Sequence, residues 1–255
     1  MDKNKLIREN LQYHLNNSIQ LFKGKFSFPN LLKKELKSIE SIEWEGSSNI
    51  ELEKFKKERQ LKLIDLLNDK NLHDQLDYTI RQLVDVKDSF YQDYIENQLI
   101  NNFSLIASNI FTENNLKLNV LFLEHDYQEE AYFCGFEAQD YKFKLLSGQE
   151  YLEFNHEKEL FNGVGSFDYT MLLKPFLELE EAIDEDKLDV INDALVQGDY
   201  LEEVKKLFFL NSFLGIHLSL NKIKGKIRQT KIPMHDEVFV FANEHDCEQL
   251  NVFVL

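Results

Sequence analysis

The sequence is poor in the residues that form tight turns between short strands, with only 9 Gly and 3 Pro among 255 residues. A sandwich or barrel of many short strands needs such residues at its turns, so their scarcity excludes this class of all-β fold. Cysteine is equally scarce, since Cys134 and Cys247 are the two in the chain. Two cysteines do not make a disulfide framework in a chain of this size, and they are typical of a reducing compartment.

Long apolar runs are also missing. None approaches the roughly 20 residues that a helix needs to span a bilayer. The first residues, Met1 to Leu6, lead into an amphipathic pattern and not into the continuous apolar segment of a signal peptide. We therefore expect a cytoplasmic protein that has no membrane partner.

Basic residues are outnumbered by acidic ones, and the formal net charge is −16. The excess is uneven, because residues 116–221 carry 8 Lys/Arg against 22 Asp/Glu, whereas residues 1–115 carry 16 against 18. Such a field repels nucleic-acid phosphates and anionic lipid, and it attracts basic proteins or cations. We expect no nucleic-acid partner. Solvation of the surface of a soluble protein would also explain the charge.

Apolar residues recur at helical spacing through the first 115 residues, as Leu11, Leu15 and Ile19 do. The pattern predicts helices over residues 3–22, 29–44 and 50–69, with Asn49 as a cap for the third. It then predicts one long helix, or two in line, from about residue 72 to 110. We expect residues 1–115 to form a helical layer.

The pattern changes over residues 116–155, where aromatic and β-branched runs are bounded by polar or Gly positions. These runs, at 118–123, 132–136, 141–143 and 151–154, predict a meander of three or four antiparallel strands. Residues 162–166 are expected to end it. Helices follow at about 176–184, 187–196 and 200–222, and then a basic connector over 222–231 leads to a hairpin over 237–255.

The predicted fold is therefore α+β. A mainly helical N-terminal layer, residues 1–115, precedes a small antiparallel sheet in residues 116–255, and the two hairpins of this sheet bracket a helical insert. The two parts could also form one continuous domain.

The tripeptide Glu-His-Asp occurs twice, at 124–126 and 244–246, each time between two apolar runs. If the hairpins meet in one sheet, the turns could bind a divalent metal through His125, Asp126, His245 and Asp246, as a metal-dependent hydrolase would require. Against this, neighbouring residues on a strand point to opposite faces, and tripeptides recur by chance. Turn chemistry or fold duplication is the explanation that we favour.

Other catalytic motifs fail on one required residue. The run His156-Glu157-Lys158-Glu159-Leu160 lacks the second histidine of a zincin helix. Gly163 and Gly165 are followed by Asp168 where a dinucleotide fingerprint needs its third glycine. No nucleophile elbow and no Walker loop occurs in the sequence. We therefore expect a protein that is not an enzyme and holds no cofactor.

The acidic residues themselves are the remaining candidate. Eleven Asp/Glu fall within residues 178–203, where Lys187 is the one basic residue. Mutual repulsion costs stability, and contact with a basic protein surface would relieve it. We predict a non-enzymatic protein–protein interaction module, and the sequence leaves a homo-oligomer open. The predicted partner-binding residues are Glu178, Glu180, Glu181, Asp184, Glu185, Asp186 and Asp189.

Overall fold

The computed structural model describes residues 2–23, 27–43, 48–84, 89–109, 115–125, 130–138, 141–145, 158–182, 200–244 and 250–255. Within these ranges the fold is α+β, as predicted, with seven α-helices and one five-stranded sheet. The chain divides into two compact units. Unit 1 comprises residues 1–14, 86–173 and 210–255, and unit 2 comprises residues 15–85 and 174–209.

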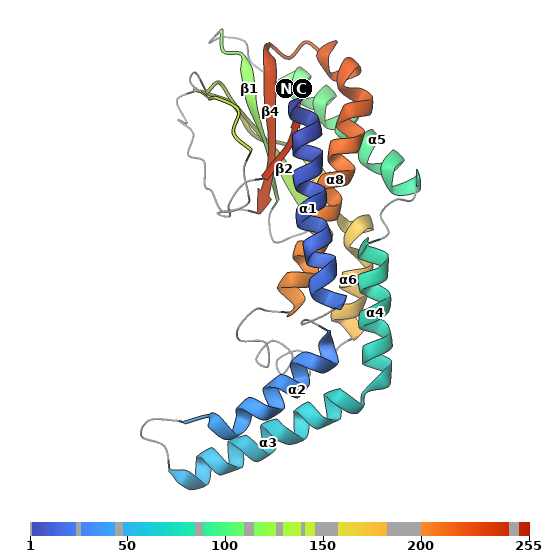
Figure 1. The fold of residues 1–255 in the computed structure, drawn as a ribbon. Helices are drawn as coiled ribbons and strands as arrows, with labels where there is room; N and C mark the ends of the chain where they lie inside the picture. Colours follow the sequence, from blue (N-terminus) through green and yellow to red (C-terminus); the bar gives the residue numbers. More distant parts are fainter. Residues whose placement is uncertain are drawn as a thin grey trace. The chain divides into compact units, whose positions relative to one another are not determined.

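The helices lie mostly in the first half of the chain (Figure 1). They are α1 (Lys3–Lys23), α2 (Phe28–Ser38), the 3-10 helix η1 (Ile39–Ser41), α3 (Asn49–Asn68), α4 (Lys70–Val84), α5 (Ser89–Asn109), α6 (Thr170–Ala182) and α8 (Tyr200–Arg228). The strands are β1 (Leu118–His125), β2 (Glu130–Phe136), β3 (Glu159–Asp168), β4 (Met234–Glu244) and β5 (Leu250–Val254).

The sheet has the strand order β3-β2-β1-β4-β5. The pairs β1–β2, β2–β3 and β4–β5 are antiparallel, but β1 and β4 pair in parallel, with Leu121 opposite Val240. The prediction of an antiparallel sheet is therefore wrong, and the sheet is mixed. A parallel pair needs a long connection, and residues 126–233 separate the two strands.

Both faces of the sheet in unit 1 are apolar. α5 and the part of α8 that belongs to unit 1 lie along one face (Figure 1). There Leu121 and Phe133 are buried together with Phe103 of α5 and Ile216 of α8. The opposite face is aromatic and carries Phe122, Phe136, Phe239 and Phe241. The rings of Tyr141 and Phe143, from the segment after β2, pack on Phe239 and Phe241, and ring separations in this group are 4.7–6.2 Å. Burial on both sides explains why these strands read as continuous apolar runs.

The third strand lies later in the chain than the sequence predicts. Residues 141–145 belong to no strand, and residues 151–154 lie outside the described part. β3 contains the run 162–166 that was expected to end the sheet. The positive φ angles of Gly163 (63°) and Gly165 (79°) explain the difference. Both glycines sit where the β2–β3 register shifts, so they form bulges inside a strand.

Two helix ends also differ from their predictions. Ser48, not Asn49, caps α3, and it forms a capping box with Glu51. The basic run expected as a connector continues α8 as far as Arg228. Ile223 and Ile227 keep the apolar face of this helix buried to its end, at 2% and 1% exposure, so the helix continues past residue 222.

Unit 2 is helical. Its core includes an aromatic group in which Phe28 lies 5.4 Å from the rings of both His73 and Tyr200. The half-buried Arg59 guanidinium of α3 lies 3.0 Å from the Glu35 carboxylate of α2 and joins these helices. Among the described residues, no helix combines the length and the apolar composition that crossing a bilayer requires.

The two bulge glycines give a matched pair of substitutions. A Cβ at Gly163 would meet nothing within 4 Å, whereas a Cβ at Gly165 would overlap the side-chain oxygen of Asn102. We expect Gly163→Ala to lower the free energy of unfolding by about 1 kcal/mol, from backbone strain alone. Gly165→Ala should cost about 2–3 kcal/mol, because it also displaces Asn102 from its hydrogen bonds. Urea denaturation of both variants checks this, and equal losses would contradict the role given to Asn102.

Candidate functional site

The two Glu-His-Asp tripeptides follow neighbouring strands. β1 ends at His125 and β4 ends at Glu244, and these residues are opposite each other in the parallel pair. The carboxyl ends of both strands therefore meet at the same edge of the sheet. The register places His125 opposite Glu244 and not opposite His245, so the tripeptides are offset by one residue.

His125 is a core residue. Its side chain is 2% exposed and lies against the rings of Tyr169, at 6.2 Å, and Phe213, at 5.9 Å. Burial lowers its pKa to about 3, because desolvation penalises the charged imidazolium. The imidazole is neutral at physiological pH. A side chain enclosed in this way leaves little room for an open metal position beside it.

The other three predicted metal ligands, Asp126, His245 and Asp246, lie outside the described residues. Within the described ranges, no group of three or more His, Cys, Asp or Glu side chains could hold a metal ion. The four-residue metal site stays a prediction.

Cys134 lies on the opposite face of the sheet from His125, because the register pairs it with Phe122. Its thiol lies 3.0 Å from Oδ1 of Asn162 and 3.8 Å from Oε2 of Glu124. Burial, together with the charges of Glu124 and Glu159, raises the pKa of this thiol to about 11. The geometry holds Cys134 as a neutral hydrogen-bond donor and not as a nucleophile.

The interior of unit 1 has no ligand pocket where α5 and α8 cover the described strands. The space between them is lined by apolar side chains such as Leu99, Leu123 and Val252, and it has no room for a water molecule. Small-molecule sites are usually hollow and contain a few convergent polar groups. This region is a packed core.

The predicted acidic surface is described in part. Glu178 and Glu181 lie on α6 and are exposed, and Glu178 pairs with Lys174 at 3.5 Å. Glu180 belongs to the same helix, but its side chain lies outside the described part, as do Asp184, Glu185, Asp186 and Asp189. Glu178 and Glu181 are three residues apart and so share one side of the helix.

Sequence reasoning missed a group of side-chain amides that bind main-chain groups. Each of these side chains donates a hydrogen bond to the C=O of one residue and accepts another from the N–H of that same residue. They are Asn4, Gln98, Asn102 and Asn119. The one signal for them is the four-residue spacing of Gln98 and Asn102, which places both on one side of α5. That spacing is common on helix surfaces, so the sequence gives it no special meaning.

A scan of the chain against protein-family models, a search of curated proteins and a search of solved structures found no match.

The low pKa of His125 makes stability depend on pH. In the unfolded chain its pKa is near 6.5, so between pH 6.5 and about 3 the unfolded state binds a proton that the folded state does not. Stability should fall as pH falls, by about 2 kcal/mol from this group between pH 7.5 and 5.0. We expect His125→Phe, which keeps a ring beside Tyr169 and Phe213, to remove this contribution to the loss of stability at low pH.

Denaturation midpoints of wild type and His125→Phe at pH 7.5 and 5.0 check the expectation. Part of the pH dependence should remain, because burial also lowers the pKa of His217. Identical pH dependence in the two proteins would contradict the burial of His125.

The raised pKa of Cys134 predicts an unreactive thiol. In a Cys247→Ala variant at pH 8, we expect Cys134 to react with a disulfide reagent at least about 100-fold more slowly in the native protein than in urea, since the thiolate is that much rarer. Absorbance of the released thiol measures both rates. Fast native labelling would show that the thiol is accessible and ionised.

Proposed function

We propose that this protein is a cytosolic, non-enzymatic interaction module that binds a basic protein through its acidic residues between 178 and 203. The observation that carries the proposal is the charge of this segment, which has eleven Asp/Glu and one Lys. In this proposal the hairpins β1–β2 and β4–β5 bracket, along the chain, the helical insert that presents the acidic residues. A Lys- or Arg-rich surface would relieve the mutual repulsion and would meet the segment quickly.

The described part of this segment supports the proposal. Glu178 and Glu181 are exposed on α6. The ion pair between Lys174 and Glu178 joins side chains that are 62% and 60% exposed, so it holds them weakly and leaves the carboxylate accessible. A partner's lysine or arginine can therefore replace Lys174 at little cost.

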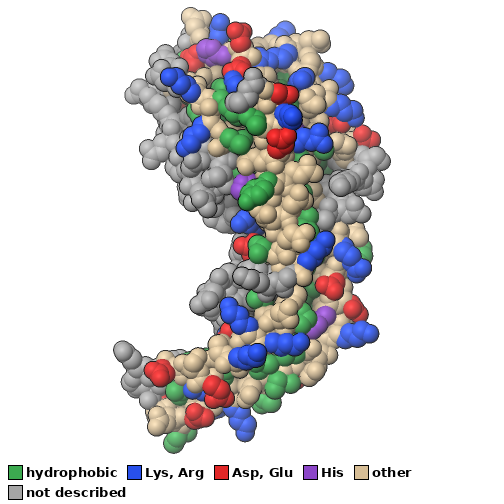
Figure 2. All heavy atoms as spheres, viewed as in Figure 1, with side chains coloured by type: hydrophobic (Ala, Val, Ile, Leu, Met, Phe, Trp, Pro, Cys, Tyr) green, Lys and Arg blue, Asp and Glu red, His purple; other side chains and the backbone are tan. Residues whose placement is uncertain are grey.

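The charge of the neighbouring helices of unit 2 differs from that of this segment. α2 and α3 together carry 8 Lys/Arg and 5 Asp/Glu. Acidic and basic side chains are interspersed over both helices (Figure 2). The acidic excess is thus local to one segment, as expected for a surface that selects a basic partner.

Two observations favour binding over catalysis. His125, at the end of β1, and the thiol of Cys134 are both buried and held neutral, so neither is prepared to transfer a proton or attack a substrate. The covered face of the sheet is filled with side chains. These features support a module whose surface, and not an interior cleft, carries the function.

The metal-dependent hydrolase remains the second candidate, because the parallel pairing of β1 and β4 brings the ends of both strands together. Its ligands would be His125, Asp126, His245 and Asp246. Elemental analysis after incubation with zinc or manganese and gel filtration tests it. A bound equivalent in wild type that His245→Ala abolishes would favour this candidate over the interaction module.

A lysine-rich synthetic peptide serves as a probe of the acidic segment. We expect wild type to bind it at low salt, with an affinity that falls steeply as salt rises, because exposed charges are screened. Reversing Glu180, Glu181, Asp184 and Glu185 to Lys should weaken binding by at least about tenfold at low salt. Fluorescence anisotropy of the labelled peptide measures both effects.

The matched control reverses four exposed carboxylates outside the segment, Glu9, Glu53, Glu58 and Asp65. It changes the net charge by the same amount. If the two sets of charge reversals weaken binding equally, the affinity of the peptide depends only on the overall charge, and the segment is not a docking surface. Binding that does not change with salt would also contradict the proposal.

A further inference from the structure

The edge strands of the sheet are β3 and β5. Every second residue of an edge strand points its N–H and C=O away from the sheet, and another chain can pair with these groups. In this protein, side chains from helices occupy several of them. The pattern is the same at both edges, although the helices involved are different.

At the β3 edge, α5 provides the side chains. Asn102 donates to Ser166 O at 2.8 Å and accepts from Ser166 N at 3.0 Å. Gln98 donates to Asp168 O and accepts from Asp168 N, both at 2.8 Å. The register sets Phe167 opposite Ala131 and Asp168 opposite Glu130 of β2. Because the N–H and C=O of both Ser166 and Asp168 bond side chains of α5, these groups face away from β2.

The two spacings match. Residues four apart on a helix rise about 6.0 Å, and residues two apart on a strand are about 6.6–6.8 Å apart. Gln98 and Asn102 therefore reach Asp168 and Ser166 as an antiparallel neighbouring strand would. Each carboxamide supplies the same donor and acceptor as a peptide group.

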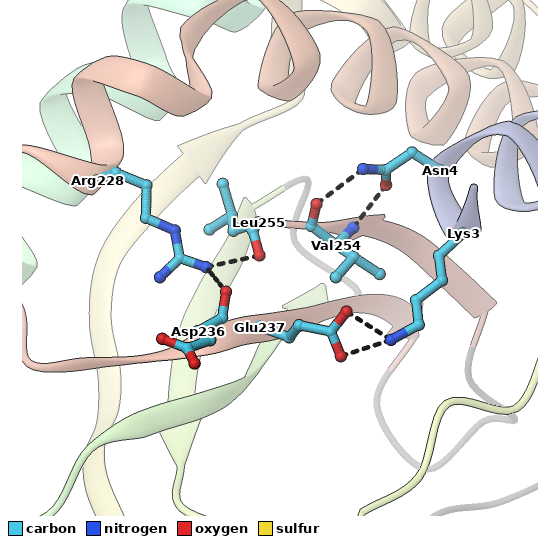
Figure 3. Close-up of polar contacts among 7 residues, drawn as sticks. All are labelled: Lys3, Asn4, Arg228, Asp236, Glu237, Val254 and Leu255. Carbon is cyan, nitrogen blue, oxygen red and sulfur yellow. Dashed lines mark hydrogen bonds and ion pairs between the residues drawn. The ribbon is translucent and has the colours of Figure 1, made fainter. Parts of the chain in front are cut away.

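At the β5 edge, the first turn of α1 does the same. Asn4 donates to Val254 O at 2.9 Å and accepts from Val254 N at 2.8 Å (Figure 3). Leu255 exchanges both of its main-chain hydrogen bonds with Val238 of β4, so the groups of Val254 face outward. Two residues earlier, Nδ1 of His217 bonds Val252 O at 2.8 Å.

The contacts around Asn4 fix the position of this turn. Lys3 forms an ion pair with Glu237 of β4 (Figure 3). Its ammonium also lies 5.3 Å from the centre of the Phe239 ring. Arg228, at the end of α8, donates to Leu255 O at 2.6 Å. The C=O of Val252 is thus bonded by α8, and the N–H and C=O of Val254 are bonded by α1.

We propose that Asn4, Gln98 and Asn102, the edge carboxamides, prevent a second copy of this chain from adding its own edge strand to this sheet. A second copy is the partner that fits, because two identical edges can pair antiparallel about a two-fold axis and satisfy each other. The bulges at Gly163 and Gly165 act in the same direction, since they bend β3 and interrupt its row of hydrogen-bonding groups.

The test removes one carboxamide at a time. Asn102→Ala and Asn4→Ala each lose two hydrogen bonds at an edge. The matched control is Asn119→Ala, because Asn119 makes the same two bonds with Ala138, both at 2.7 Å, but belongs to the inner strand β1. All three variants remove one carboxamide and its two hydrogen bonds to the main chain of a strand or of the residues after it, and two of them open an edge. Asn102→Ala also removes the bond that Asn102 donates to Gln98 O within α5, at 3.0 Å.

We expect Asn102→Ala and Asn4→Ala to self-associate as protein concentration rises, in sedimentation velocity experiments, while wild type and Asn119→Ala keep their size. In dilute samples, amide exchange at Ser166 or Val254 should speed up at least about tenfold in the edge variant concerned. The same amide should become protected again as the variant associates, because the strand of a second copy then pairs with it.

Asn102→Asp provides a second test. Its carboxylate still accepts from Ser166 N but cannot donate to Ser166 O, and its charge opposes the approach of another strand. We expect a protein less stable than wild type that does not associate. The proposal is overturned if Asn102→Ala and Asn4→Ala keep the wild-type size, if Asn119→Ala associates as much as they do, or if Asn102→Asp associates as much as Asn102→Ala.

Discussion

The parallel pairing of β1 with β4 is the contact on which the rest of unit 1 depends. It joins the antiparallel strands β1, β2 and β3 to the β4–β5 hairpin, which would be marginal alone, and so forms one sheet with an apolar surface on both sides. It also makes β1 a central strand and leaves β3 and β5 at the edges. From this order follow the burial of His125, the separation of Cys134 from it, and the outward position of Val254 and Ser166.

Local sequence patterns predicted much of the fold, because helices leave a signal within a few turns. The apolar spacing of Leu11 and Leu15 is enough to identify α1, and the aromatic runs identify β1 and β4. The direction in which β1 and β4 pair has no local signal, since both faces of these strands are apolar. β3 was missed because Gly163 and Gly165 look like a loop until their positive φ angles show bulges.

The candidate site was less predictable for a different reason. The sequence around a histidine at the end of a strand is the same whether its side chain faces water or the core. His125 is buried against Tyr169 and Phe213, which are far from it in the chain. The carboxamides of Asn4 and Asn102 have the same difficulty, since asparagine near a helix surface is ordinary. Charge is easier to predict, because the acidic excess of residues 178–203 is a property of composition.

The order of the edge contacts along the chain has a consequence for synthesis. Asn4 and Val254 are 250 residues apart, and Asn102 precedes Ser166 by 64. In each case the helix residue is made before the strand residue that it binds. An edge strand is therefore completed only after the helix residue that bonds it has been synthesised, so its cover does not have to wait for a later part of the chain.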